Sequence, residues 1–259
     1  MGDSADLTRK ALMIAGTVGA GMIARKLTRQ PQQSDLRGQV VFITGGSRGL
    51  GLLMAREFAR EGCRIAICAR DVQELEGATR DIEQIVPSVL ALPCDVADQS
   101  QVSLTLEKII RHFGQIDVLV NNAGIIAVGP VETMTRQDFE HAMNVMFWGT
   151  VFTTLAVLPE MIRRQSGRIV NITSIGGKVS VPHLIPYSCA KFAVVAFSEG
   201  LRAELAKDHI PVTTIVPGLM RTGSHVNAFF KGQQNAEFTW FSLGGYLSDS
   251  GYRSRASGA

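Results

Sequence analysis

Cysteine is scarce in this sequence. Among 259 residues there are four cysteines, Cys63, Cys68, Cys94 and Cys189, and none has CxxC spacing or the Cys/His spacing of a metal site. The sequence therefore predicts neither a disulfide framework nor a bound metal, and a reducing compartment is expected. Cys63, Cys68 and Cys94 lie in or beside apolar stretches, so we expect them to be small buried side chains.

An excess of charge of one sign is absent from most of the chain. The net charge of +3 arises within residues 1–37, which hold six basic and three acidic side chains, so the remaining residues sum to zero. A neutral main domain lacks the basic surface that nucleic acid requires, and nucleic acid is excluded as an expected partner. The local basic excess favours a membrane surface instead.

Long hydrophobic runs are also absent, with one borderline segment. Residues 11–24, ALMIAGTVGAGMIA, are uncharged and lie between Arg9-Lys10 and Arg25-Lys26. A helix of this length spans about 21 Å, less than the ~30 Å hydrocarbon core, although flanking Lys and Arg stems can reach the interface. We expect a membrane anchor that leaves the rest of the chain cytoplasmic, with a disordered or surface-packed leader as the alternative. The basic cluster directly after the run disfavours a cleaved signal peptide.

Apolar, strand-like runs alternate with amphipathic helical stretches after this leader. Near-continuous apolar strands that are each followed by a helix predict an α/β fold, a doubly wound parallel sheet of Rossmann type with three layers. The expected strands are 40–44, 64–69, 88–94, 116–120, 168–173 and 211–216, and the expected helices are 50–61, 71–86, 98–113, 136–164 and 187–207. We divide the chain into a leader (1–37), a dinucleotide-binding catalytic domain (38–243) and a disordered tail (244–259).

A glycine-rich turn, GGSRGLG, joins the first expected strand to its helix. Glycines let backbone N–H groups approach a pyrophosphate, to which the helix N-terminus adds partial positive charge. At the end of the second strand, where many NAD-binding domains have an acid, this chain has Arg70, and Arg48 lies within the glycine turn. Two arginines beside one site predict NADP(H), whereas Asp71 keeps NAD as the alternative.

Tyr187 and Lys191 stand four residues apart in YSCAK, at the start of an expected helix. This spacing places the ammonium near the phenol, where a fixed cation favours phenolate and brings the pKa of about 10 towards the operating range. Ser174 follows an expected strand, at the edge where α/β sheets bind their ligands. The three residues together predict acid/base chemistry on a hydroxyl or carbonyl group. His183 lies close by, but a packed or surface role is expected for it.

These motifs together resemble the short-chain dehydrogenase/reductase family, in its compact single-domain branch, over residues 35–231. The resemblance implies hydride transfer between NADP(H) and a hydrophobic alcohol or ketone, with Tyr187 as acid/base, Ser174 on the substrate carbonyl, Lys191 on the nicotinamide ribose and Asn144 holding a relay water. It implies an adenine contact for Asp95. The cofactor-binding residues implied, besides Tyr187 and Lys191, are Gly45, Ser47, Arg48, Gly49, Leu50, Gly51, Arg70, Asn122, Ala123, Gly124, Pro217, Gly218 and Thr222.

The end of the chain departs from this family. The last helix and seventh strand that the family places after the PG loop are missing from the expected elements, which leaves 211–216 as an unpaired apolar edge. We therefore expect a homo-oligomer, or an NADP-binding regulatory or scaffold protein without turnover as the alternative to an enzyme. A sugar-nucleotide-modifying relative is disfavoured because too few residues follow the PG loop. Expected lid residues, either pocket-lining or ordinary packing, are Met220, Val226, Phe229, Phe230, Phe238, Trp240 and Phe241.

Overall fold

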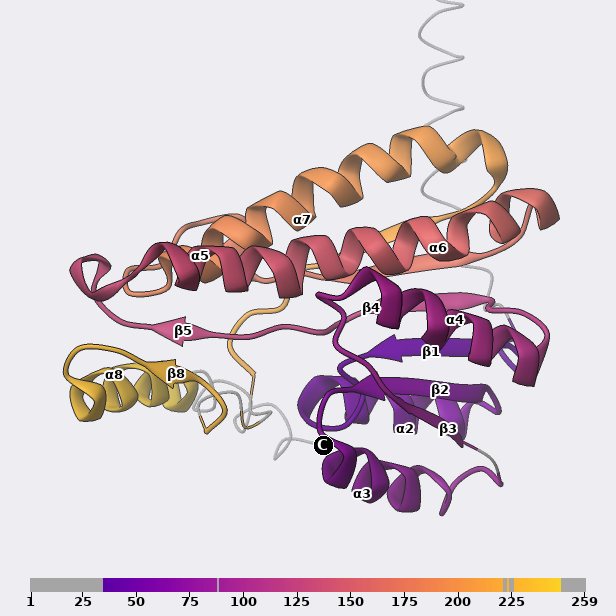
Figure 1. The fold of residues 1–259 in the computed structure, drawn as a ribbon, viewed down its shortest axis with the longest axis horizontal. Coiled ribbons are helices and arrows are strands. Elements are labelled where there is room, and N and C mark those ends of the chain that lie inside the picture. Colours follow the sequence, from indigo (N-terminus) through magenta and orange to yellow (C-terminus); the bar gives the residue numbers. More distant parts are fainter. Residues whose placement is uncertain (1–34, 88, 221–222, 224–225, 248–259) are drawn as a thin grey trace, which may run out of the picture. The chain divides into compact units, whose positions relative to one another are not determined.

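A six-stranded parallel sheet is the centre of the computed structural model, which describes residues 35–87, 89–220, 223 and 226–247. Its strand order is β3-β2-β1-β4-β6-β7 (Figure 1). The chain divides into residues 1–35 and 36–259, and the sheet belongs to the second unit. The predicted anchor at 11–24 lies outside the described residues. The strands are β1 (Val40–Thr44), β2 (Arg64–Ala69), β3 (Val89–Pro93), β4 (Val118–Asn121), β6 (Arg168–Ile172) and β7 (Val212–Ile215).

Helices cover both faces of the sheet, which confirms the predicted doubly wound fold (Figure 1). Alternate strand residues point to opposite faces, so Val40 and Phe42 pack with one set of helices and Val41 and Ile43 with the other. On the first face lie α4 (Gln99–Phe113), α6 (Gly149–Arg164) and α7 (Ile185–Glu204). On the second face lie α2 (Gly49–Arg60) and α3 (Val72–Ile82).

Coverage of the second face ends at β6. In β7, Val212 is buried against the first face, whereas Thr213 and Ile215 are exposed, Ile215 by 40%. Within the part of the chain that the structure describes, no strand pairs with the outer edge of β7. Among the described residues β7 is thus an edge strand, as expected for residues 211–216.

Buried polar side chains connect β4, β6 and β7 to the helices of the first face. The Asn121 Nδ2 donates to Asn171 Oδ1 at 2.9 Å, and Asn171 Nδ2 donates to Ser198 Oγ at 3.0 Å. Ser198 in turn lies 2.7 Å from Thr214 Oγ1. Thr153 and Thr154 of α6 complete the set through Asn121. Because each of these buried groups has a partner, the network orders the strands without leaving a polar atom unpaired.

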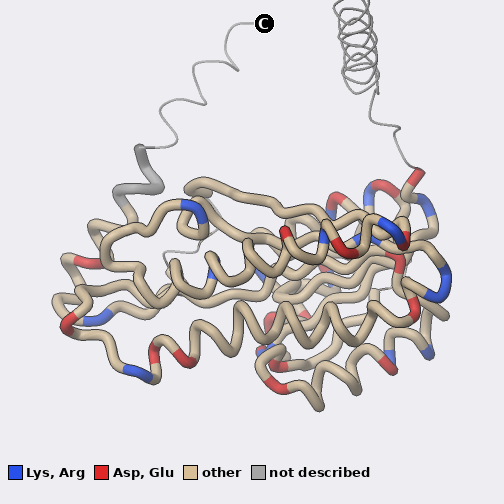
Figure 2. The backbone as a smooth tube through the Cα atoms, turned by 90° about the horizontal axis from the view of Figure 1, so that it is seen from above, with Lys and Arg blue, Asp and Glu red and all other residues tan. Residues whose placement is uncertain are grey.

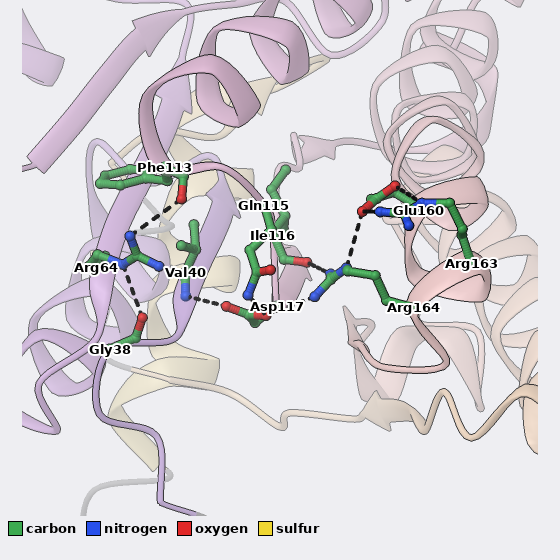
Figure 3. Close-up of polar contacts among 10 residues, drawn as sticks. All are labelled: Gly38, Val40, Arg64, Phe113, Gln115, Ile116, Asp117, Glu160, Arg163 and Arg164. Carbon is green, nitrogen blue, oxygen red and sulfur yellow. Dashed lines mark hydrogen bonds and ion pairs between the residues drawn. The ribbon is translucent and has the colours of Figure 1, made fainter.

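The amino ends of the strands are joined by the carboxylate of Asp117 (Figure 3). This carboxylate accepts from Val40 N at 2.9 Å, from Gln115 Nε2 at 2.7 Å and from Arg164 Nη1 at 3.2 Å. The contacts fix the start of β1 to the end of α6. The carboxyl ends of the strands, at the opposite edge, are where an open α/β sheet binds its ligand.

Several elements differ from the expected ones. Residues 136–164 form one apolar helical stretch, but a π-helical segment, η2 (Met143–Trp148), separates α5 (Arg136–Ala142) from α6. A short parallel pair, β5 (Ala127–Val128) with β8 (Phe229–Phe230), was not expected. Helix α8 (Gln234–Leu247) extends into the tail predicted to be disordered, because Phe238 and Phe241 pack against Phe230. Residues 248–259 lie outside the described ranges.

The helical stretch Arg136–Arg164 is the single one, among the described residues, that is long and apolar enough to cross a membrane. Its most apolar window has a mean hydropathy of 1.5 and is half buried in the protein, as expected of a helix that packs on a sheet. Figure 2 shows acidic and basic residues interspersed over the described chain. Cys63, Cys68 and Cys94 are buried as predicted, and Cys189 is exposed.

Candidate active site

A cavity of about 590 Å³ opens at the carboxyl ends of the strands. Its walls come from the β1–α2 turn, the segment after β4, the segment after β6 with the first turn of α7, and the segment after β7 with α8. These are the loops of a switch point, because β1 continues the sheet towards β2 and β4 continues it in the other direction. The cavity is therefore where this fold type is expected to hold a ligand.

The glycine turn is built from close backbone contacts. Gly45 adopts φ +64, a left-handed conformation that favours glycine. A Cβ on Gly51 would lie 2.1 Å from the Gly45 carbonyl oxygen, so only glycine fits there. Asn122 Nδ2 donates to the carbonyl oxygens of Thr44, at 3.0 Å, and Gly45, at 3.1 Å. The turn is thus held in one conformation against the segment after β4.

The N-terminus of α2 faces the cavity without a capping side chain. Its N-cap residue, Arg48, makes no side-chain cap hydrogen bond, and its first turn has no acidic residue. In contrast, Asp71 caps α3 and Asp98 caps α4 with their carboxylates. The uncapped backbone amides and the partial positive charge at the N-terminus of α2 suit an anion such as a pyrophosphate. The residues present at this end of the cavity therefore fit a dinucleotide.

Tyr187, Lys191 and Ser174 converge on the cavity. Tyr187 lies in the first turn of α7 and Lys191 lies one turn later, with its Nζ 5.8 Å from the centre of the Tyr187 ring. The Lys191 Nζ donates to the carbonyl oxygen of Ile172 at 2.8 Å. A Cβ on Gly176 would lie 3.1 Å from Tyr187 Cε1, so this glycine allows the ring to pack against the segment that carries Ser174.

Burial dominates the ionisation of this group of residues. Burial raises the pKa of Tyr187, and a hydrogen bond with Ser174 only partly opposes the rise. Burial also lowers the pKa of Lys191 to about 8. The sequence predicted that Lys191 would lower the pKa of the phenol, and in this structure the direction is the opposite. The physical reason is desolvation, because both side chains are removed from water and Lys191 points its Nζ at the Ile172 carbonyl.

The model of the short chain dehydrogenase family matches residues 39–231. The chain belongs to this family. It is 38% identical over 216 residues to the dehydrogenase/reductase SDR family protein 7-like of Anopheles gambiae, covering 80% of this chain and 68% of that protein. It is 36% identical over 222 residues to the dehydrogenase/reductase SDR family member 7B of Rattus norvegicus, covering 83% and 68%.

Two similar solved structures hold different dinucleotides. A xylitol dehydrogenase with bound NAD+ has a TM-score of 0.71 at 32% identity, covering 73% of this chain and 74% of that one. A variant of actinorhodin polyketide ketoreductase with NADPH has the same TM-score, identity and coverage. This short-chain dehydrogenase is therefore an oxidoreductase of a family with dehydrogenase and reductase members, and these two similar structures contain NAD+ and NADPH respectively.

The cavity brings together most of the residues that the sequence predicted for this short-chain dehydrogenase. Its walls include Arg48, Gly49, Leu50, Arg70, Asn122, Gly124, Ser174, Tyr187, Lys191, Pro217 and Gly218. Other predicted residues do not line it, and their roles stay predictions: Gly45, Ser47, Gly51, Asp95, Ala123 and Asn144. Asn144 is exposed in the π-helical segment η2, and Thr222 lies outside the described residues.

Two contacts near the cavity were not found from the sequence. Glu74 binds Ser47 and Arg48 of the glycine turn of this short-chain dehydrogenase. His183 Nδ1 lies 2.6 Å from the buried carboxylate of Glu237, and its ring lies against Trp240. The sequence signal for Glu74 was its position in the first turn of α3, four residues after Arg70. For His183 there was no local signal, since its partner is 54 residues away.

The apolar residues after β7 divide into two groups. Met220, Phe229, Trp240 and Phe241 line the cavity. Phe230 and Phe238 instead contact each other, and Val226 is exposed. The segment is tied down by Lys231, which pairs with Asp138 of α5, and by the contact between His183 and Glu237. The two readings of these residues from sequence, pocket lining and ordinary packing, therefore each hold for part of the set.

Proposed function

We propose that this protein transfers a hydride between NADP(H) and a hydrophobic alcohol or ketone. The observation that carries the proposal is the convergence of Tyr187, Lys191 and Ser174 on a cavity that also contains the uncapped N-terminus of α2. One half of the cavity suits a dinucleotide, and the other half presents a proton donor and a hydrogen-bond donor to a small molecule. Family membership supports an oxidoreductase with this arrangement.

Each of the three side chains has a distinct task in the proposal. The Ser174 hydroxyl donates a hydrogen bond to the substrate oxygen and thereby orients it. The Tyr187 hydroxyl gives a proton to that oxygen in reduction and takes it back in oxidation. Lys191 supplies positive charge beside the phenol when protonated and hydrogen-bond donors towards the cofactor ribose. The bound nicotinamide supplies or accepts the hydride.

NADP(H) is favoured over NAD(H) by the groups at the end of β2. Arg70 lines the cavity, is exposed, and forms no hydrogen bond or ion pair with another described residue, so its guanidinium is available to a 2′-phosphate. Asp71, the residue that left NAD open as an alternative, accepts from Glu74 N at 2.9 Å and caps α3. A carboxylate engaged in this way is less suited to bind a ribose 2′-hydroxyl.

An apolar substrate is supported by apolar side chains of the cavity wall. Ile125, Leu184, Leu219, Trp240 and Phe241 are among the residues that line it. Such walls favour a bulky apolar carbonyl compound over a small polar one, because little polar surface is available to replace its hydration.

The test is to measure NADPH oxidation in the presence of a panel of apolar ketones, with the loss of NADPH absorbance as the readout. Tyr187→Phe should lower kcat by about 10²- to 10⁴-fold while NADPH still binds, because the proton donor is lost and the ring remains. Ser174→Ala should also lower kcat, whereas Ser103→Ala, on the exposed side of α4, should not. Wild-type protein that binds NADPH but reduces no ketone would contradict the proposal and favour the regulatory or scaffold alternative.

A homo-oligomer is proposed on the exposed apolar side chains of α6 and its preceding turn. Trp148, Leu155 and Ile162 are spaced by seven residues, so they share one helix face, and each is at least 36% exposed. Leu104 of the adjacent α4 is also exposed. A second copy would bury this face. Light scattering should give a dimer or larger assembly, and Leu155→Glu should shift it to monomer; a monomeric wild type would contradict this.

Attachment to a membrane through residues 11–24, on its cytoplasmic side, is proposed on the uncharged run and its basic flanks. In cells, deletion of residues 1–30 should move the protein from the membrane fraction to the soluble fraction. Equal distribution of both forms would remove the support for an anchor.

A further inference from the structure

Glu74 reaches from the first turn of α3 back to the glycine turn after β1. One carboxylate oxygen accepts from Ser47 Oγ at 2.9 Å, and the other accepts from Arg48 Nη1 at 2.8 Å. The Arg48 side chain is 52% exposed and that of Glu74 is 32% exposed. Both oxygens therefore hold the turn, and the negative charge stands beside one of the two cations expected at the cofactor.

The two arginines of the cavity consequently differ in their charge environment. Arg70 has no ion pair with any residue in the described ranges, whereas Arg48 is paired with Glu74. A guanidinium has five N–H donors, so Arg48 can still bind a second anion while Glu74 holds Nη1. The net charge of the group formed by Arg48, Arg70 and Glu74 is +1 instead of +2.

We propose that Glu74 is a selectivity residue, whose charge weakens discrimination in favour of NADP(H) over NAD(H). The inference rests on the proposed function, because it assumes that the end of β2 and the glycine turn receive the adenosine ribose. A 2′-phosphate is repelled by the nearby carboxylate and is attracted less strongly by a neutralised Arg48. A 2′-hydroxyl is uncharged, so the same carboxylate does not repel that group in NAD(H).

Glu74 also has an orienting effect, which the experiment must separate from its charge. Glu74→Gln removes the charge and retains an oxygen that can accept from Ser47 or Arg48. Glu74→Ala removes both the charge and the acceptors. The glutamine variant is therefore the test of the charge, and the alanine variant reports on the loss of orientation.

A matched control is available in the same pair of helices. Arg56 of α2 pairs with Asp81 of α3, its Nε 2.7 Å from Asp81 Oδ2, and these side chains are 32% and 30% exposed. Neither residue lines the cavity. Asp81→Asn thus removes a second acid that links α2 to α3, with no charge change beside the proposed ribose site.

The experiment measures dissociation constants for NADPH and NADH by fluorescence titration at low ionic strength. Glu74→Gln should raise the selectivity for NADPH, Kd(NADH)/Kd(NADPH), by about two- to fivefold, mainly by tightening NADPH binding. Added salt should reduce the gain, because exposed charges are screened. Asp81→Asn should leave the ratio unchanged. In an Arg48→Gln background the effect of Glu74→Gln should shrink, since part of it acts through Arg48.

The outcomes separate this inference from the proposed function. An unchanged or lower ratio in Glu74→Gln, in protein that binds both dinucleotides, overturns the role of Glu74 alone. A wild type that prefers NADH contradicts the proposed NADP(H) preference, yet a ratio that rises in Glu74→Gln still supports Glu74. Binding of neither dinucleotide overturns both.

Discussion

Strand β2 and strand β7 belong to the same sheet but differ in how they are covered. In β2 four consecutive residues are buried, because α4 lies on one face and α2 and α3 lie on the other. In β7 the first residue is buried and Thr213 and Ile215 are exposed, because helices cover one face only. The sheet is thus covered by helices on both faces where the dinucleotide is proposed to bind. It is covered on one face only at β7, from which the chain continues to the proposed substrate side.

The cavity shows the same difference between its two sides. The side proposed for the dinucleotide is shaped by the glycine turn, in which Gly51 packs against Gly45 and Asn122 holds the turn. The side proposed for the substrate carries apolar side chains of β8 and α8, of which Phe229 and Trp240 are about half exposed. The backbone contacts fix the conformation of the glycine turn, whereas exposed aromatic side chains can be replaced by other residues at little cost in stability. The difference suggests a constant cofactor side and an adaptable substrate side.

The largest difference is expected from the same substitution in the two strands. Ile65 in β2 is fully buried, so Ile65→Ala should lower the free energy of unfolding by about 2–5 kcal/mol. Ile215→Ala in β7 should cost less than about 1 kcal/mol, because 40% of the side chain is already exposed. Urea unfolding measures both. Equal costs would show that another copy or segment covers β7 in solution and would break the comparison.

The buried Lys191 should give the unfolding free energy a pH dependence. Its pKa is lowered to about 8 in the folded protein and is near 10.4 when unfolded. Below about pH 8 the folded state is destabilised by the buried charge, and the unfolded state binds more protons up to about pH 10.4. Stability relative to Lys191→Met should therefore rise between these values, by up to about 3 kcal/mol. Tyr187 is present in both proteins, so the effect of its raised pKa on stability cancels in this difference. A flat difference across this window would contradict the burial of Lys191.

Substitutions of two glycines test whether close backbone contacts in the glycine turn are needed for dinucleotide binding. Gly51→Ala should weaken NADPH binding by about 100-fold, because its Cβ would overlap the Gly45 carbonyl oxygen and displace the turn. Gly77→Ala in α3 is the control: its Cβ would meet no atom within 4 Å, so it should stabilise the helix by about 0.5–1 kcal/mol. NADPH titration and thermal unfolding measure the two effects. Normal binding by Gly51→Ala would argue against a tightly fixed turn.

The smallest effect is expected on the substrate side. Trp240→Ala should raise KM for a bulky apolar ketone by about three- to tenfold, with the Kd of NADPH unchanged, because an apolar wall is removed. Phe238→Ala is the matched control, since both residues are in α8 and 43% exposed but only Trp240 lines the cavity. Steady-state kinetics decides between them. An equal change in both variants would indicate that α8 acts as a whole rather than through Trp240.

The sequence predicted features that lie within short stretches of the chain and missed contacts between residues that are far apart in it. Strand and helix periods, the GGSRGLG turn and the spacing of Tyr187 and Lys191 are all contained in short stretches, and the structure places them as expected. The contact of Glu74 with Arg48 and that of His183 with Glu237 depend on how α3 and α8 pack, which no short stretch encodes. The pKa of Tyr187 was predicted in the wrong direction because the charge of Lys191 was visible in the sequence and the burial was not.

The hydrogen bond between Asn121 and Asn171 fixes the register of β4 with β6, and with it the position of Ser174. The two asparagines are paired directly in the ladder of β4 and β6. If β6 slipped by one residue, Asn171 would face the other side of the sheet and Ser174 would move by about 3.3 Å. Such a slip would break the hydrogen bond between the two amides and the one from Asn171 to Ser198, which makes it costly. The alignment of Ser174 with the segment after β4 is thus specified by an amide pair that does not line the cavity.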